Sequence, residues 1–232
     1  ADDVPFRLDQ EWCNYLYLNG VIDSEHTVDA RGEPQFVCRF SCPFVQERLF
    51  SGLSTDLVGD RMPILPLEIF DDLDDVFGPE GLDLAALLER YKAYLVRLAA
   101  KGIDPWREQP RRADLHLTEA VAHFHLYAWL VSAVGRRCAV SPEFPTGNGK
   151  VDLHLWCGAH RGVIEVKSFV DMHELGRWRE QAARYGASLD LHRVTLALFA
   201  PTTDEEVLRK LSGETTLDGV AVAVVAIGWG TG

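Results

Sequence analysis

Two hydrophobic periods alternate along the second half of the chain, and each change of period predicts a change of secondary structure. Over 116–134, apolar residues recur three and four positions apart, which is typical of a helix packed on one side. Three predicted strands follow at about 137–143, 150–157 and 161–168, the last two joined by a turn at 158–162. This pattern predicts one long helix followed by three strands.

The same reasoning carries the prediction to the C-terminus. It gives a helix at 172–187, a strand at 192–199, a helix that begins with a capping box at Thr203, and a strand at 218–226. Helices and strands in this order favour an α/β domain with a mixed central sheet, which we assign to 111–232.

The first half predicts a smaller module and a connecting region. An amphipathic helix at 12–19, a hairpin with its turn near 30–33 and a second helix at 44–53 predict a winged-helix-like module over 1–55. Residues 56–110 combine a linker with one helix at about 83–100. We interpret the linker's acidic cluster as a solvated charge run rather than a metal site, and it consists of Asp71, Asp72, Asp74 and Asp75.

Charge is distributed unevenly between the halves. The net charge of −12 argues against a nucleic-acid partner, because phosphate binding depends on lysine and arginine. Residues 1–110, however, hold 21 acidic and 10 basic side chains, whereas 111–200 hold 9 and 11. The second half can therefore face a polyanion, while the acidic first half favours docking on a partner.

Targeting signals and cysteines bear on the compartment. No apolar run is long enough to span a membrane, and no secretory leader is recognisable, so we expect a cytoplasmic protein. The chain opens without methionine, and we expect a fragment of a longer protein. The odd number of cysteines predicts free thiols in a reducing compartment; the five are Cys13, Cys38, Cys42, Cys138 and Cys157. The alternative is a zinc site, for which the candidates are Cys38 with Cys42 and the set His154, Cys157 and His160.

The predicted hairpin brings ionisable residues to one face. Residues two apart in a strand share a face, so Glu165 and Lys167 lie together, beside Asp152 of the preceding strand. Two carboxylates and a lysine on a hairpin between helices need a compensating cation or partner. The pattern therefore indicates a Mg²⁺ site, with a buried ion-pair cluster without catalysis as the alternative.

Flanking residues extend this set. Glu119 begins the preceding helix and Glu143 ends the first strand, and either can complete a metal shell. Gln181 and Tyr185 lie one turn apart on the following helix, where they can contact a substrate. His123 and His154 can approach the site as supporting groups, since His123 follows Glu119 by one turn, whereas His125 faces away from it.

The order Glu119, Asp152, Glu165-Val166-Lys167 and Gln181 to Tyr185 resembles the PD-(D/E)XK nuclease superfamily, in particular its RecB-like branch with a QxxxY helix. The resemblance covers about 113–227 and implies a restriction-endonuclease-like αβββαβ core. Residues 119–127 and 142–153 look like the C-terminal nuclease domains attached to AAA-type ATPases, and residues 15–22 with 41–50 resemble the winged-helix end of such ATPases. Val151 replaces the proline of the family's name, and the chain has no GxxxxGK[ST] phosphate loop.

The resemblance implies the role of each residue. Metal ligands would be Asp152, Glu165 and the Val166 carbonyl, with Lys167 serving the attacking water and Glu119 supporting the shell. Glu143, from its place at the end of the first strand, is a further candidate ligand. Substrate contacts would come from Gln181 and Tyr185. Lys150 is a further candidate for substrate binding. The implied cofactor is Mg²⁺, which Mn²⁺ can replace, the substrate is DNA, and the partner is an ATPase module in the same or another chain, with a homo-oligomer left open. The alternative is a catalytically silent adaptor that keeps the fold.

Overall fold

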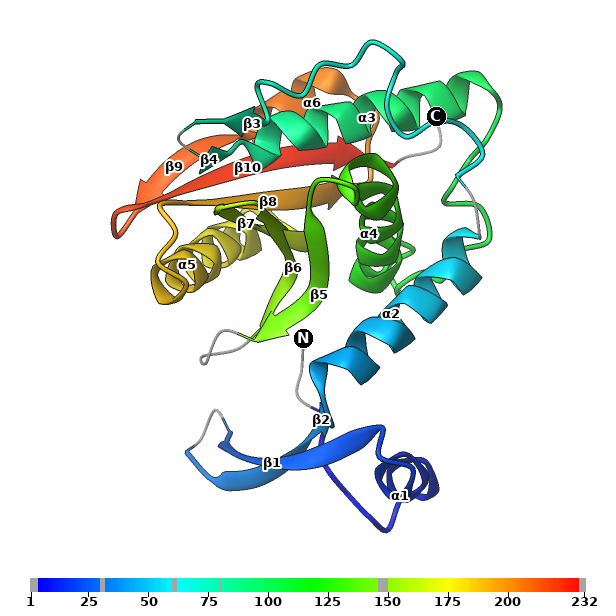
Figure 1. Ribbon diagram of the computed structural model, residues 1–232, viewed down its shortest axis with the longest axis vertical. Helices are drawn as coiled ribbons and strands as arrows, with labels where there is room; N and C mark the ends of the chain where they lie inside the picture. The colour runs from blue at the N-terminus through cyan, green and yellow to red at the C-terminus, as the bar shows by residue number, and fades with distance from the viewer. Residues whose placement is uncertain (1–3, 30–31, 60–61, 80, 146–149, 230–232) are drawn as a thin grey trace. The chain divides into compact units, whose positions relative to one another are not determined.

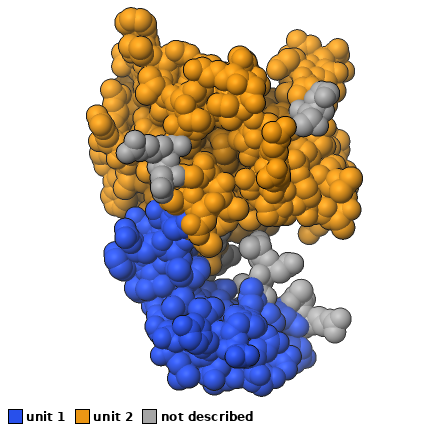
Figure 2. Space-filling model, turned by 90° about the vertical axis from the view of Figure 1, so that its right-hand side faces the viewer, with its two compact units in different colours: residues 1–52 blue, residues 53–232 orange. Residues whose placement is uncertain are grey.

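The computed structural model describes residues 4–29, 32–59, 62–79, 81–145 and 150–229, of which 143–145 are described by their backbone alone. The chain forms two compact units, residues 1–52 and 53–232, which Figure 2 distinguishes by colour.

The first unit begins with a helix, a hairpin and a second helix, as the sequence predicts (Figure 1). Helix α1 covers Glu11–Leu18, strands β1 (Ile22–Val28) and β2 (Pro34–Phe40) pair antiparallel, and α2 covers Pro43–Val58. Gly20 has φ +68°, a conformation that suits glycine directly after a helix. Helix α2 is longer than expected and ends beyond the unit's boundary, while part of the predicted turn at 30–33 lies outside the described residues.

A six-stranded mixed sheet forms the centre of the second unit, in the spatial order β5-β6-β7-β8-β10-β9 (Figure 1). The strands are β5 (Ala139–Pro145), β6 (Lys150–Cys157), β7 (His160–Ser168), β8 (Arg193–Ala200), β9 (Gly213–Leu217) and β10 (Val220–Gly228). Strand β7 pairs parallel with β8, and β8 parallel with β10, while the other neighbours are antiparallel. The predicted α/β class with a mixed sheet is confirmed.

Helices cover both faces of this sheet. They are α3 (Leu84–Ala100), α4 (Glu119–Val134), α5 (Met172–Ser188) and α6 (Glu205–Leu211). Leu198 of β8 packs in one apolar cluster with Leu175 of α5 and Leu208 of α6. Its neighbour Phe199 points to the opposite face, where its ring lies 6.2 Å from that of Tyr91 in α3.

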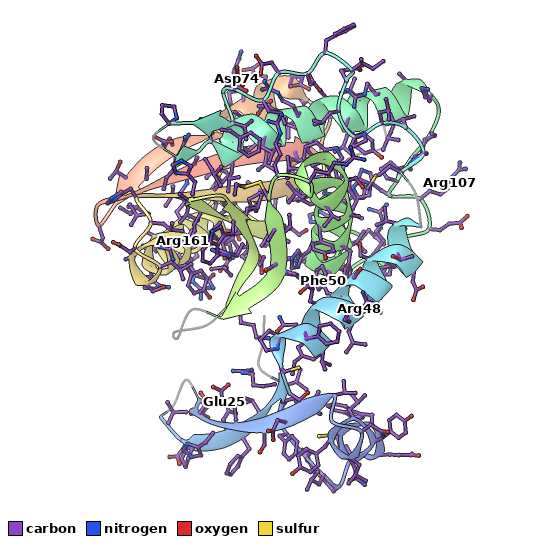
Figure 3. All side chains as sticks on the ribbon, viewed as in Figure 1. Glu25, Arg48, Phe50, Asp74, Arg107 and Arg161 are labelled. Atoms are coloured by element: carbon purple, nitrogen blue, oxygen red, sulfur yellow. A yellow bond between two sulfur atoms is a disulfide. The ribbon has the colours of Figure 1, made fainter. Side chains whose placement is uncertain are left out.

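Helix α5 lies very close to the sheet at Gly186. A Cβ added there would lie 2.7 Å from Val220 Cγ1 and 2.9 Å from Val194 Cγ2, so only glycine fits unless these valine side chains move. At the same end of α5, the Arg161 guanidinium (Figure 3) donates to the Leu189 carbonyl at 3.3 Å and ties the start of β7 to the end of the helix.

The region 56–110 is more than a linker. Helix α3 belongs to the second unit and buries Leu87, Leu88, Tyr91 and Leu98. The acidic segment before it, which carries Asp74 (Figure 3), is tied to α3 by two ion pairs, Arg90–Asp75 at 2.9 Å and Arg97–Glu68 at 2.9 Å. A short antiparallel pair, β3 (Phe77–Gly78) and β4 (Gly81–Leu82), precedes the helix.

The expectation that all five cysteines are free is wrong for one pair. Cys138 and Cys157 form a disulfide with a Cα separation of 4.2 Å, because the β5–β6 register pairs Ala139 with Trp156 and so places Cys138, just before β5, opposite Cys157 at the end of β6. Sequence spacing alone does not reveal this register. In the first unit the sulfurs of Cys13 and Cys38 lie 3.9 Å apart as free thiols. No helix among the described residues is long and apolar enough to cross a membrane.

Candidate functional site

The candidate site lies where β6 and β7 separate. Their register runs from Cys157↔His160 to Leu153↔Ile164, and from Ile164 onward β7 also pairs with β8. Just beyond the last of these β6–β7 pairs, the Asp152 carboxylate accepts the Val166 N–H at 2.7 Å. The Asp152 N–H in turn donates to Glu165 Oε1 at 3.4 Å. The predicted proximity of Asp152 and Glu165 is therefore present.

Lys167 gathers three carboxylates around its ammonium group. Its Nζ lies 3.3 Å from Glu119 Oε1, 3.4 Å from Asp152 Oδ2 and 3.8 Å from Glu165 Oε2. The Lys167 and Glu165 side chains are 8% and 3% exposed, whereas those of Asp152 and Glu119 are 16% and 40% exposed. The four form a cluster that is closed on the side of the sheet and open at Glu119.

The cluster has an excess of negative charge, because three carboxylates share one ammonium. Burial, and then repulsion from Asp152, raises the pKa of Glu165 well above its ordinary value. Burial also raises the pKa of Glu119. For Lys167, burial lowers the pKa, but the attraction of Asp152, Glu119 and Glu165 outweighs it and leaves the pKa above its ordinary value. The lysine therefore stays protonated and donates hydrogen bonds.

Helix α4 brings Glu119 to the cluster. Thr118 caps the helix by accepting the Val121 N–H at 3.4 Å, which leaves Glu119 in the first turn. The buried Ser168 hydroxyl donates to the Leu117 carbonyl at 2.9 Å and fixes the end of β7 beside the start of α4. Sequence patterns did not single out this bond, since a serine at a strand end has no distinguishing period.

Helix α5 supplies the second predicted pair. Gln181 Nε2 donates to the Tyr185 hydroxyl at 2.9 Å. Tyr185 packs against the apolar cluster that holds Val151 and Val163 of β6 and β7. Burial raises the pKa of the Tyr185 phenol, with a further contribution from the negative charge of Glu165. The phenol is thus within electrostatic reach of the carboxylate cluster.

The other predicted residues lie on strands β5, β6 and β7. The Glu143 side chain lies outside the described part of the chain, so its role as a ligand stays a prediction, and so does that of the Val166 carbonyl. Lys150 begins β6 and is partly exposed. His154 is buried near Trp156, with ring centroids 6.4 Å apart, and its pKa is lowered by burial and then by the charge of Arg161.

The remaining histidines of α4 have different surroundings. His125 faces away from Glu119, as expected, and its Nδ1 lies 2.7 Å from the Tyr91 hydroxyl inside an aromatic cluster. His123 lies at the site, with its Nε2 2.9 Å from the Asp152 carbonyl oxygen.

Two observations bear on metals. Among the residues described, no group of three or more His, Cys, Asp or Glu side chains is arranged to hold a metal ion, and the three carboxylates share the Lys167 ammonium instead. A zinc site around His154, Cys157 and His160 would need the Cys157 sulfur, which is bonded to Cys138.

Comparisons of this protein with protein-family models, curated proteins and solved structures found no match.

Proposed function

We propose that residues 113–227 form a PD-(D/E)XK nuclease domain that hydrolyses DNA phosphodiester bonds with Mg²⁺ and serves as the effector of a larger ATPase-containing protein. The observation that carries the proposal is the meeting of Glu119, Asp152, Glu165 and Lys167 where β6 and β7 separate. The element order α4-β5-β6-β7-α5-β8 supports it, because it has the αβββαβ order that the resemblance implies.

The donor set suits a hard divalent cation in its chemistry, and the three carboxylates, which pair with Lys167, would have to turn towards the ion. Carboxylate oxygens are the ligands that Mg²⁺ takes in proteins, and three carboxylates against one ammonium leave negative charge to neutralise. The raised pKa of Glu165, caused by burial and by Asp152, indicates that this charge is poorly compensated. Asp152 and Glu165 would hold the ion, with Glu119 at the exposed side. Bound Mg²⁺ supplies Lewis acidity at a phosphate oxygen.

The chain's own residues would orient the water and the phosphate. Lys167, which stays protonated, donates a hydrogen bond to the attacking water and holds it near the phosphorus. The Tyr185 hydroxyl, which accepts from Gln181, keeps its own proton to donate to a phosphate oxygen. Asp152 keeps its orientation because its carboxylate also accepts the Val166 N–H.

The test is a cleavage assay with linear, circular and single-stranded DNA in MgCl₂ and in EDTA. We expect magnesium-dependent cleavage that Asp152→Ala and Lys167→Ala reduce by at least about 100-fold, and that Arg209→Ala, an exposed substitution on α6, leaves unchanged. Cleavage that persists in both site variants, or no cleavage by the unmodified chain, contradicts the proposal.

One observation favours a second function, a catalytically silent adaptor. The Lys167 ammonium already pairs with all three carboxylates, so the cluster can stand as a structural ion-pair network. Calorimetric titration with MnCl₂ separates the two functions. Binding that Asp152→Ala abolishes favours the nuclease, and absence of binding favours the adaptor.

A further inference from the structure

His123 makes a direct contact with the backbone of the site. The residue is 5% exposed and lies one turn after Glu119 on α4. Its Nε2 is 2.9 Å from the Asp152 carbonyl oxygen. A carbonyl oxygen only accepts, so Nε2 carries the hydrogen and His123 is the donor.

This bond acts at the point where the strands separate. Between Cys157 and Leu153, β6 is aligned by its pairing with β7, and the register ends there. At Asp152, two side chains form hydrogen bonds with the backbone: Glu165 accepts the N–H and His123 donates to the carbonyl. On its other edge β6 stays paired with β5 as far as Lys150. The imidazole adds a direct link between the Asp152 backbone and α4, the helix that also presents Glu119.

We propose that His123 is a positioning residue for the metal site, which holds the Asp152 backbone so that the Asp152 and Glu119 carboxylates face the same cation. This inference rests on the proposed metal-binding function and deepens it. The role needs only a hydrogen on Nε2. The neutral ring with its hydrogen on Nε2 can supply it, and so can the protonated ring. Groups that orient metal ligands alter affinity by about 10- to 100-fold when they are removed.

The test compares three variants of the full chain by calorimetric titration with MnCl₂ and by the MgCl₂ concentration that half-saturates cleavage. His123→Leu removes the donor and should weaken Mn²⁺ binding by at least about tenfold. His123→Gln retains an N–H at a similar reach and should stay within about threefold of the unmodified chain. Val134→Ala removes a buried contact at the far end of α4 and should lower stability without altering metal affinity.

The outcomes separate the inference from the proposed function. Mn²⁺ binding by His123→Leu equal to that of the unmodified chain overturns the inference, and so does a loss in folded His123→Gln as large as that in His123→Leu. A comparable loss in Val134→Ala also overturns it, because the effect would then be general destabilisation. Mn²⁺ binding that follows the expected order without any DNA cleavage supports the role of His123 and contradicts only the nuclease. An unmodified chain that binds no Mn²⁺ overturns both.

Discussion

Replacement of Glu165 by glutamine should stabilise the folded chain in the absence of metal while it abolishes metal binding. The Glu165 side chain is 3% exposed and its nearest cation is Lys167 Nζ at 3.8 Å. At an effective dielectric constant of about 20, this attraction is worth about 4 kcal/mol. Burial of a carboxylate costs several kcal/mol, and Asp152 adds repulsion on the same face.

The direction of the pKa decides which effect is larger. The pKa of Glu165 is raised well above its ordinary value by burial and by Asp152, so the folded state disfavours the charged form. Glutamine keeps the shape and can still accept the Asp152 N–H, which donates to Glu165 Oε1 at 3.4 Å. We expect a gain of about 1–2 kcal/mol, which is within the range of single stabilising substitutions.

The pH dependence has a definite sign. Because the folded-state pKa of Glu165 is raised, the stability that this carboxyl contributes is present at low pH and is lost as the pH rises through that pKa. Glutamine does not titrate, so the advantage of Glu165→Gln over the unmodified chain should grow from pH 5.5 to pH 8.5.

The assay is urea denaturation in EDTA at both pH values. Glu205→Gln, at an exposed position on α6, serves as the matched control and should change the unfolding free energy by less than about 0.5 kcal/mol. The reasoning is refuted if Glu165→Gln is less stable than the unmodified chain at pH 8.5, because the charged carboxylate would then be a stabilising member of the cluster.

Three further predictions concern the second unit. Burial lowers the pKa of His125 from 6.5 to about 4, so the unfolded chain is protonated at this residue before the folded chain as the pH falls. Urea denaturation should show that the unfolding free energy falls by about 2 kcal/mol between pH 7 and pH 5. His125→Gln should lack this fall. Gly186→Ala should lower the unfolding free energy by about 1–3 kcal/mol, since the added Cβ would lie 2.7 Å from Val220 Cγ1, and an unchanged urea midpoint would contradict this packing. Reduction of the Cys138–Cys157 disulfide, which spans 19 residues, should lower the unfolding free energy by about 3 kcal/mol. Urea denaturation with dithiothreitol, compared with denaturation without it, measures this loss. A double serine variant should show no effect of the reductant.

Hydrophobic period predicted most of the second unit because each strand there buries side chains in a regular order. The helix predicted from residue 116 begins at Glu119, since Thr118 caps it. The pattern missed β9, Gly213–Leu217, a short edge strand whose side chains are mostly exposed. It also missed the packing of α3, because an amphipathic helix does not reveal which surface covers its apolar face.

In the site too, the positions set by local pattern could be predicted, whereas a contact between residues far apart in the sequence could not. A period of two places Glu165 and Lys167 together, and a hairpin adds Asp152, so these three positions could be inferred from local pattern. The contact of Lys167 with Glu119 depends on where α4 starts relative to β7, which the bond from Ser168 to Leu117 fixes. Such a contact joins residues far apart in the sequence and needs the folded chain.

The most direct measurement of the central claim is cleavage of end-labelled linear DNA by the unmodified chain and by Asp152→Asn, in MgCl₂ and in EDTA. Asparagine keeps the size of the side chain and removes one charge from the proposed metal site. The account predicts cleavage by the unmodified chain in MgCl₂ alone, and a loss of at least about 100-fold in Asp152→Asn. Equal cleavage by both proteins, or cleavage that EDTA does not stop, would contradict a magnesium site at Asp152, Glu165 and Lys167.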